Sequence, residues 1–400
     1  MGEKRFAAMF KGDRAIWALV ALFMIYSLLA VYSSSAGIAF SRFGGNTAYF
    51  FRSQLIMLAL GLIIIIITHR LSVYIYSSLA NLFFIAAIIL LVLTLFIGVR
   101  INEATRWIEI PGTGFRLQSS DVAKVALIIY LSRVLSQSQG GELNNFRFVT
   151  IRLIMPVAAV CLLIITENLS TALMIFGISI LLLFIGRVPV KFLLAYAGIG
   201  IAGLVLVVYL ITVIWPGNNR VQVWKHRVEN YFSAEKTSDD ESYQTTQSRI
   251  AIATGGLFGK APGKSTQRNM LPQSNSDFIF AIIVEEYGLI FGAIPLILAY
   301  MILLFRGIAI AKKCDTAFPA FLVLGLTLMI VIQALVNMLV ASGLFPVTGQ
   351  TLPMISWGRT SVLVVSFSIG AILSVSRVNN ARLRNEELPE EDKKNEGDMI

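Results

Sequence analysis

The chain has 400 residues, of which 56% are hydrophobic and only 14% charged, and it carries a formal net charge of +10. Soluble chains hold a much larger share of charged residues. The low charged share and the mean hydropathy of +0.75 together exclude a soluble globular protein. Two cysteines and two histidines leave little material for a disulfide framework, a His-rich metal site or a Ser-His-Asp triad. The composition predicts an all-α integral membrane protein.

Apolar runs recur along the chain, and about 20 such residues suffice to cross the hydrocarbon layer as a helix. We expect a polytopic bundle of ten transmembrane helices at 15–35, 54–68, 75–98, 120–135, 149–166, 169–187, 190–214, 278–305, 318–343 and 361–377. A large loop, 215–277, separates helices 7 and 8. The polar, charge-mixed residues 378–400 predict a disordered tail.

Lys and Arg residues set the orientation, since cytoplasmic flanks carry the excess. The flanks on the side of the N-terminus hold 18 of them, and the short flanks on the other side hold 6. This predicts that both termini are cytoplasmic and that the 215–277 loop lies outside. The division is then 1–14 as a cytoplasmic N-terminus, 15–377 as the transmembrane domain and 378–400 as a cytoplasmic tail. The net charge suits anionic lipids rather than nucleic acid.

Polar stretches gather on the predicted outer side, and the first two lie between helices 3 and 4. Arg106 precedes Trp107, a pair that either marks a site or anchors the chain at the headgroup layer. Asp121 and Lys124 are three apart, so they share a helix face about one turn below the outer surface. Such charges are costly in a membrane. They form either a structural ion pair or a ligand-facing site.

The long outer loop holds a glycine-rich, cationic stretch that includes Lys260 and Lys264. It looks like a nucleotide-binding loop, but the G-x-x-x-G-K-S spacing is one residue short and no strand precedes it. ATP is also absent outside the cell membrane, so we exclude a nucleotide site. Backbone N–H groups and ammonium charges of this kind can still approach a lipid-linked phosphate.

Three acids mark the start of helix 8. Acids near a helix start commonly accept hydrogen bonds from its first N–H groups. Asp277 therefore either caps the helix or takes part in chemistry. Glu285 and Glu286 would lie about 12 to 14 Å deep at 1.5 Å per residue, which favours a structural or relay role. Beyond helix 9, the loop 345–361 has two prolines and one charge, Arg359. It is either a re-entrant cavity wall or a plain connection.

Together these stretches resemble the SEDS family (shape, elongation, division and sporulation) across essentially all ten spans. The stretches that carry the resemblance are Ala104 to Ile108, Gln118 to Lys124, Gln247 to Lys260, Leu271 to Gly288 and Asn337 to Ser361. Several ordered motifs that match at once make it specific.

The sequence departs from the family pattern at four places. The family's Q-P-S-E has Ser119 and Asp121 as its second and fourth residues here, so the acid is shorter but kept. Its E-P-D-L-G-T-A begins Glu167-Asn168-Leu169, which weakens a chemical role for Glu167 and leaves it structural or relay. Its H-T-D-F reads Asn275-Ser276-Asp277-Phe278, and its G-G-S-S has Arg359 as its second residue. Asp277 aligns with the family's essential aspartate.

The resemblance implies a peptidoglycan glycosyltransferase that polymerises lipid II at the outer leaflet of the bacterial cytoplasmic membrane and releases undecaprenyl diphosphate. Asp277 would be the base for the acceptor hydroxyl. Cations would stabilise the diphosphate, and the candidates are Lys124, held by Asp121, with Arg106, Lys260 and Lys264. Mg²⁺ or another divalent cation would suit the leaving group, although no spacing defines a metal site, and no organic cofactor is expected.

The resemblance also implies a class B penicillin-binding protein transpeptidase and other division proteins as partners, at the division septum. A role in cell elongation is the alternative within the family. A lipid II flippase is the rival from another class, but it would need polar groups along the whole route, and the inner half is poor in them. A scaffold that only recruits partners would not need intramembrane charges.

Overall fold

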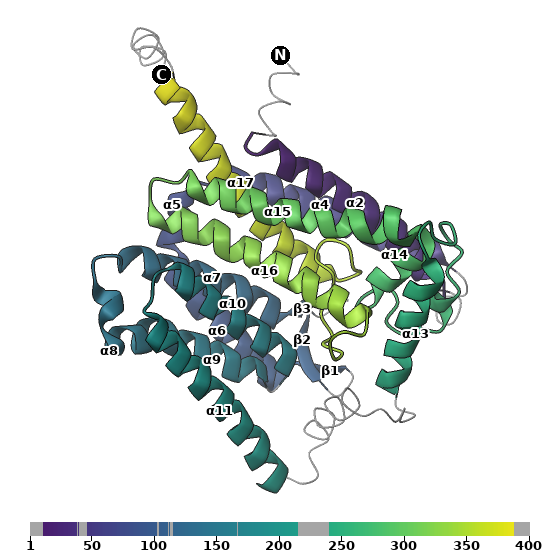
Figure 1. Cartoon of the computed structure of the whole chain (residues 1–400), viewed down its shortest axis with the longest axis horizontal. Coiled ribbons are helices and arrows are strands. Elements are labelled where there is room, and N and C mark those ends of the chain that lie inside the picture. Colours follow the sequence, from purple (N-terminus) through teal and green to yellow (C-terminus); the bar gives the residue numbers. More distant parts are fainter. Residues whose placement is uncertain are drawn as a thin grey trace.

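The structure is a computed structural model and describes residues 11–37, 39, 46–101, 104–110, 112, 115–165, 167–214 and 240–387. Part of the predicted long loop, 215–239, and the end of the tail, 388–400, therefore lie outside the described residues. The described chain is mostly helical and forms one bundle (Figure 1). Helices cover each of the ten predicted membrane ranges.

Seven helical segments are long and apolar enough to cross a membrane. They are α2 (Arg14–Ser34), α4 (Thr47–Arg70), α6 (Ala80–Ile97), α8 to α9 (Phe146–Ile165), α14 to α15 (Ile279–Lys312), α16 (Ala317–Ala341) and α17 (Arg359–Glu387, counted to Glu386). Two shorter apolar segments are α10 (Leu169–Ile185) and the start of α11 (Val190–Ile214). The remaining helix over a predicted span is α7 (Ser119–Gln137), which carries three charged residues.

Short elements connect these helices. They are α5 (Val73–Ser78), the 3-10 helices at Glu142–Asn144 and Gln267–Asn269, and the π-helical turns at Thr150–Ile154 and Leu289–Ala293. The two π turns join α8 (Phe146–Val149) to α9 (Met155–Ile165) and α14 (Ile279–Gly288) to α15 (Ile294–Lys312).

The prediction of an all-α chain was wrong between α6 and α7, where three antiparallel strands form a small sheet. They are β1 (Val99–Ile101), β2 (Ala104–Ile110) and β3 (Phe115–Gln118), in the order β1-β2-β3. β2 is rich in β-branched and aromatic residues, and Pro111-Gly112-Thr113-Gly114 separates it from β3. This is the pattern of a hairpin. The sheet leads directly into α7, because Trp107 pairs with Gln118, the last residue before that helix.

The eighth predicted span is not one straight helix. Gly288 has φ +72°, a conformation that glycine adopts without steric cost, and α14 ends there before α15 begins. The predicted loop before it is also partly helical, since α13 spans Asp240–Gly255. Figure 1 shows α13 and α14 together at one end of the bundle. The tail differs too, because α17 continues as a helix through Glu387.

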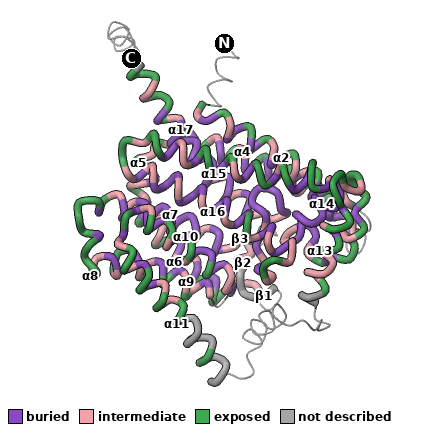
Figure 2. Tube along the Cα trace, viewed as in Figure 1, coloured by how far each residue is buried: buried purple, intermediate pink, exposed green. Residues whose placement is uncertain are grey.

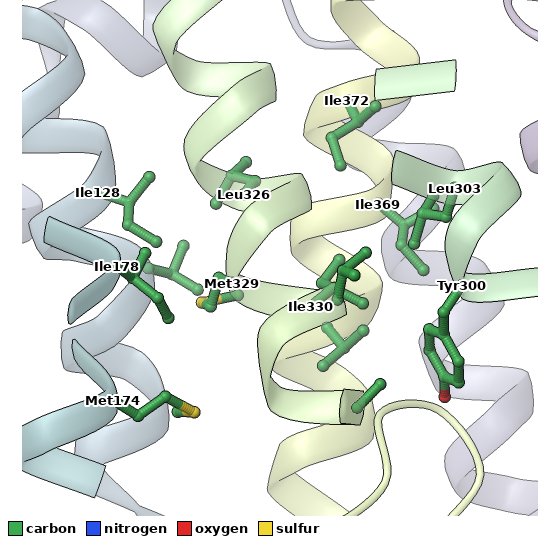
Figure 3. Close-up of a cluster of buried hydrophobic side chains, with 14 of the residues drawn as sticks. Ile128, Met174, Ile178, Tyr300, Leu303, Leu326, Met329, Ile330, Ile369 and Ile372 are labelled. Carbon is green, nitrogen blue, oxygen red and sulfur yellow. The ribbon is translucent and has the colours of Figure 1, made fainter. Parts of the chain in front are cut away.

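Among the seven long apolar segments, α16 and α17 are the most buried, and the core lies around α16. Figure 3 shows side chains of α7 and α10 on one side of α16 and side chains of α15 and α17 on the other. Figure 2 shows that buried residues are concentrated in the middle of the bundle and exposed residues at its periphery. The rows of exposed large apolar residues on α4, α6 and α15 suit contact with lipid, where apolar side chains need no protein cover.

Candidate functional site

Asp277 lies in a series of turns before α14. The N-cap position of that helix is Phe278, whose side chain makes no capping bond. The preceding turns are closed by backbone bonds from Ser276 and Phe278 to the Gln273 carbonyl, both 3.2 Å. Asp277 is half-buried. Its carbonyl oxygen accepts a 2.7 Å hydrogen bond from the Asn337 side chain of α16.

Two amide side chains of α16 organise the residues around Asp277. Gln333 and Asn337 are four apart and so share one helix face. Asn337 Nδ2 also donates to the Gln350 carbonyl at 2.7 Å, and Gln333 Nε2 donates to the Thr351 carbonyl at 3.0 Å. Both amides therefore hold the segment that follows α16.

The segment 342–358 between α16 and α17 packs into the bundle, as a re-entrant loop does. Its residues Leu352, Met354 and Ile355 are at most 2% exposed. Because buried non-helical backbone needs polar partners, other helices supply them. Tyr300 of α15 donates to the Pro353 carbonyl at 2.6 Å, and Ser27 of α2 donates to the Ile355 carbonyl at 3.0 Å.

The same loop contacts the turn that holds Asp277. Trp357 donates its backbone N–H to the Asn275 carbonyl at 2.8 Å, and the Ser356 hydroxyl donates to the Ser276 carbonyl at 2.7 Å. The turn that holds Asp277 is thus bonded to the loop through the Asn275 and Ser276 carbonyls and to α16 through the Asp277 carbonyl. The sequence pattern alone gave no sign of these contacts.

Asp121 and Lys124 form a buried ion pair in α7. Their charged atoms are 2.8 Å apart, and the side chains are only 7% and 4% exposed. Lys124 Nζ also donates to Gln333 Oε1 at 3.0 Å. Gln333 therefore connects this ion pair to Thr351, and Asn337 connects the neighbouring Gln350 to Asp277. The cation and the acid are held by one face of α16.

The glycine-rich stretch does not form the free phosphate-binding loop that the sequence suggested. The N–H groups of Lys260 and Ala261 donate to the carbonyls of Glu285 and Glu286, at 2.9 and 3.0 Å. A Cβ on Gly259 would collide with the Glu286 carbonyl oxygen. The glycines therefore serve a close backbone-to-backbone contact with the end of α14.

Glu285 and Glu286 lie near the C-terminal end of the short helix α14. Glu285 is fully buried and accepts from Lys260 Nζ at 2.6 Å, from Thr266 Oγ1 at 2.9 Å and from the Ser265 hydroxyl. Glu286 accepts from the Ser33 hydroxyl at the end of α2 and from the Ser265 N–H at 3.3 Å. These contacts favour a structural role, and they engage Lys260. Lys264 is exposed.

The remaining predicted site residues are Glu167 and Arg106. Glu167 is 2% exposed and precedes Asn168, which caps α10 by accepting from the Thr171 N–H at 3.1 Å. Asn168 Nδ2 donates to the Thr348 carbonyl at 3.4 Å, so this turn contacts the same loop. The backbone of Arg106 lies in β2, but its side chain is outside the described residues.

The comparisons with known proteins agree with one another. The profile of the FtsW/RodA/SpoVE family, described as cell cycle protein, matches residues 13–381. The chain belongs to this family. A protein named probable peptidoglycan glycosyltransferase FtsW from Trichlorobacter lovleyi is 32% identical over 368 residues, covering 91% of this chain and 93% of the relative. Stage V sporulation protein E of Bacillus subtilis is 31% identical over 369 residues, covering 91% and 97%.

Solved structures of the FtsW/RodA/SpoVE family share the fold. The rod shape determining protein RodA of Thermus thermophilus aligns with a TM-score of 0.66 at 24% identity, covering 92% of this chain and 97% of the other. A chain from a structure described as a peptidoglycan synthase complex that coordinates polymerization and crosslinking aligns with a TM-score of 0.71 at 23% identity, covering 92% and 99%. The family and its polytopic membrane character are therefore established for this chain.

The departures from the FtsW/RodA/SpoVE pattern have structural explanations in three cases. Asp121 still reaches Lys124 from its shorter side chain. Asn168 caps α10 in place of the family's proline. Arg359 begins α17 with its guanidinium 5.7 Å from the centre of the Trp357 ring, in a cation–π arrangement. Nothing in the structure explains Ser119, which is buried at the start of α7.

Proposed function

We propose that this chain is a peptidoglycan glycosyltransferase that transfers glycan from lipid II to a growing strand at the outer leaflet of the cytoplasmic membrane. The observation that carries the proposal is that Asp277 and Lys124 are both hydrogen-bonded to side chains of α16. A half-buried acid and a buried cation, both fixed by amides of one helix face, are the two charges that this transfer needs. The names of the FtsW relatives support the same activity.

In this mechanism Asp277 acts as the general base. It accepts the proton of the acceptor sugar hydroxyl as the hydroxyl oxygen bonds to the anomeric carbon of the donor. The bond between that carbon and the diphosphate oxygen breaks, and undecaprenyl diphosphate leaves with the electron pair. Positive charge aimed at this leaving group lowers the barrier. Lys124, fixed by Asp121, is the first candidate, with Lys264 and Arg106 as further ones.

For Lys260, expected as a candidate for the diphosphate, we propose a structural role. Its ammonium is engaged by Glu285, so it holds the loop against α14 rather than the diphosphate. The described residues also contain no cluster of three or more His, Cys, Asp or Glu side chains that would hold a metal ion. No residue is therefore assigned to Mg²⁺ in this mechanism.

The biological setting proposed is septal cell-wall synthesis during division, because FtsW names predominate among the relatives. An elongation role of the RodA type is the alternative. A class B penicillin-binding protein transpeptidase is the proposed partner, since one structural neighbour comes from a peptidoglycan synthase complex. We place the active face outside the cell, with both termini in the cytoplasm.

The deciding experiment compares wild type with Asp277→Asn on lipid II supplied in detergent, with and without the transpeptidase. Loss of a general base should reduce polymerisation by about 10²–10⁴-fold, while the nearly isosteric amide keeps the backbone bond to Asn337. Glu142→Gln, an exposed acid in the loop between α7 and α8, is the matched control and should polymerise normally.

Glycan-strand length on a gel gives the readout. Equal polymer from wild type and Asp277→Asn would remove Asp277 as the base. No polymer from wild type, even with its partner present, would instead favour a lipid II flippase, because detergent leaves no leaflet to cross.

A further inference from the structure

A cavity lies at the opposite end of the bundle from α13, between the start of α2, the end of α15 and the second half of α17. Its volume is about 500 Å³, within the range of roughly 300–1,000 Å³ for small-ligand pockets. The lining includes three cationic side chains, Arg14, Arg306 and Lys313, and one acid, Asp13. None of these residues belongs to the site around Asp277.

The acid in this cavity is already engaged. Asp13 caps α2 by accepting from the N–H groups of Ala15 at 2.9 Å and Ile16 at 3.2 Å. Its other oxygen accepts from Arg306 Nε at 2.8 Å, and this carboxylate is only 4% exposed. Arg306 is thereby fixed beside the cavity. Its own side chain is 46% exposed.

The other two cations are available to a ligand. Arg14 and Lys313 are exposed, and neither forms an ion pair within the part of the chain that the structure describes. Asn379 and Asn380 of α17 add amide groups to the lining. With one acid neutralising one of three cations, the cavity keeps an excess of positive charge, which suits a phosphate.

The surface next to the cavity identifies the source of that phosphate. Leu298, Ile302 and Phe305 of α15 are 53%, 44% and 64% exposed. With Ala309, which lines the cavity, they fall at i, i+4, i+7 and i+11 and so form one helix face. An exposed apolar stripe on a membrane-spanning helix faces acyl chains. It ends at the cavity, as it would if one ligand had both a phosphate and hydrocarbon chains.

We propose that this cavity binds the headgroup of an anionic phospholipid, with its acyl chains along the stripe on α15. Basic pockets between helices on the cytoplasmic side of membrane proteins bind headgroups in this way. The lysines and arginines that mark a cytoplasmic end could explain the charge alone, but not the cavity or the apolar stripe that leads into it. The bound lipid would join α2, α15 and α17 at one end of the bundle.

The test titrates phosphatidylglycerol into the purified full chain in detergent and measures bound lipid by native mass spectrometry. Each cation removed near an anionic group should weaken binding about fivefold, so Arg14→Gln with Lys313→Gln should raise the Kd about 25-fold. Arg147→Gln with Lys191→Gln removes one exposed Arg from α8 and one exposed Lys from the start of α11, on the same predicted side. This matched control should stay within about twofold of wild type.

Two further comparisons use a variant that keeps both charges and a lipid without net charge. Arg14→Lys with Lys313→Arg keeps both charges and should restore binding, whereas zwitterionic phosphatidylcholine should not distinguish the variants. Equal loss in the test and control variants would overturn the proposal, and so would inorganic phosphate alone displacing phosphatidylglycerol at millimolar concentration. Phosphatidylglycerol that binds only after removal of 388–400 would identify the acidic tail as the occupant and would also overturn it.

Discussion

The amides of Gln333 and Asn337 lie in a helix that is otherwise apolar and central to the bundle. A buried amide costs free energy unless it is hydrogen-bonded, because nothing in hydrocarbon replaces water. Asn337 Nδ2 makes two bonds of 2.7 Å, and both acceptors are carbonyls of non-helical segments. Its side chain thus supplies donors that the turn at Asp277 and the loop at Gln350 need. An uncharged residue can thereby fix the position of Asp277, the proposed base.

Asn337→Ala should therefore reduce turnover more than it reduces stability. Two buried carbonyls would lose their donor, at a cost of about 1–3 kcal/mol in unfolding free energy. A shift of Asp277 by about 1 Å would cost on the order of 100-fold in rate. We expect a large fall in kcat for lipid II polymerisation with KM little changed. Thermal unfolding in detergent measures the stability term separately.

Ser374→Ala is the matched control for Asn337→Ala. It removes one buried bond of 2.6 Å from a side chain to the Leu71 carbonyl, far from Asp277. Its stability loss should be similar, with kcat close to wild type. If the two variants lost turnover in proportion to stability, Asn337 would be a structural residue and not a positioning one.

The residues of the site differ in how far sequence could predict them. The Asp121–Lys124 pair follows from a separation of three residues on one helix, so local geometry was enough. The contact of Lys260 with Glu285 could not be predicted, because the two residues are 25 apart in sequence and meet only through tertiary contact. Gln333 had no assigned role, although an isolated amide in an apolar span is itself a signal of a buried polar contact.

At the scale of elements, the sequence predicted the positions of helices better than the positions where a helix ends within an apolar run. The run 278–305 is apolar throughout except for two acids, and hydropathy alone cannot show that α14 ends within it. The break depends on backbone contact, since Leu289 N–H donates to the Gly256 carbonyl at 3.0 Å. A single glycine in a helical pattern does not specify such a partner. The sheet before α7 was missed for another reason, because its hairpin signal was taken as an interhelical loop.

Close helix packing gives a second prediction at this scale, at Gly370 where α17 crosses α4. A Cβ at this position would lie 2.9 Å from the Ile65 carbonyl oxygen and would collide with the Thr68 hydroxyl. Small residues let membrane helices approach in this way. Gly370→Val should lower stability by about 1–3 kcal/mol through overpacking, seen as a lower unfolding temperature in detergent.

The chain offers a control with the same chemistry for Gly370→Val. Gly177 lies in α10, where an added Cβ meets no atom within 4 Å. Gly177→Val should therefore change the unfolding temperature little. An equal fall in both variants would show that the loss comes from the β-branched side chain in a helix and not from the contact between α4 and α17.

At the scale of the whole molecule, charge and fold give independent information on topology. The start of α2 and the second half of α17 line one cavity, so both ends of the described chain lie at the same end of the bundle. The chain between them must therefore cross the membrane an even number of times. The excess of Lys and Arg at this end predicts that it is the cytoplasmic one. The loop that contains α13 is then predicted to lie outside, where the substrate of the proposed reaction would be presented.

Single cysteines can test this arrangement in cells. On a background with Cys161→Ala and Cys314→Ala, Tyr243→Cys places a thiol on the exposed side of α13, and Glu142→Cys places one in the loop between α7 and α8. An impermeant thiol reagent added to intact spheroplasts should label the cysteine at 243 and leave the one at 142 unlabelled. Detergent should then expose both to the reagent, which controls for local burial. Labelling at 142 in intact spheroplasts, with none at 243, would reverse the topology and place Asp277 on the cytoplasmic side, where an outer-leaflet polymerase could not use it.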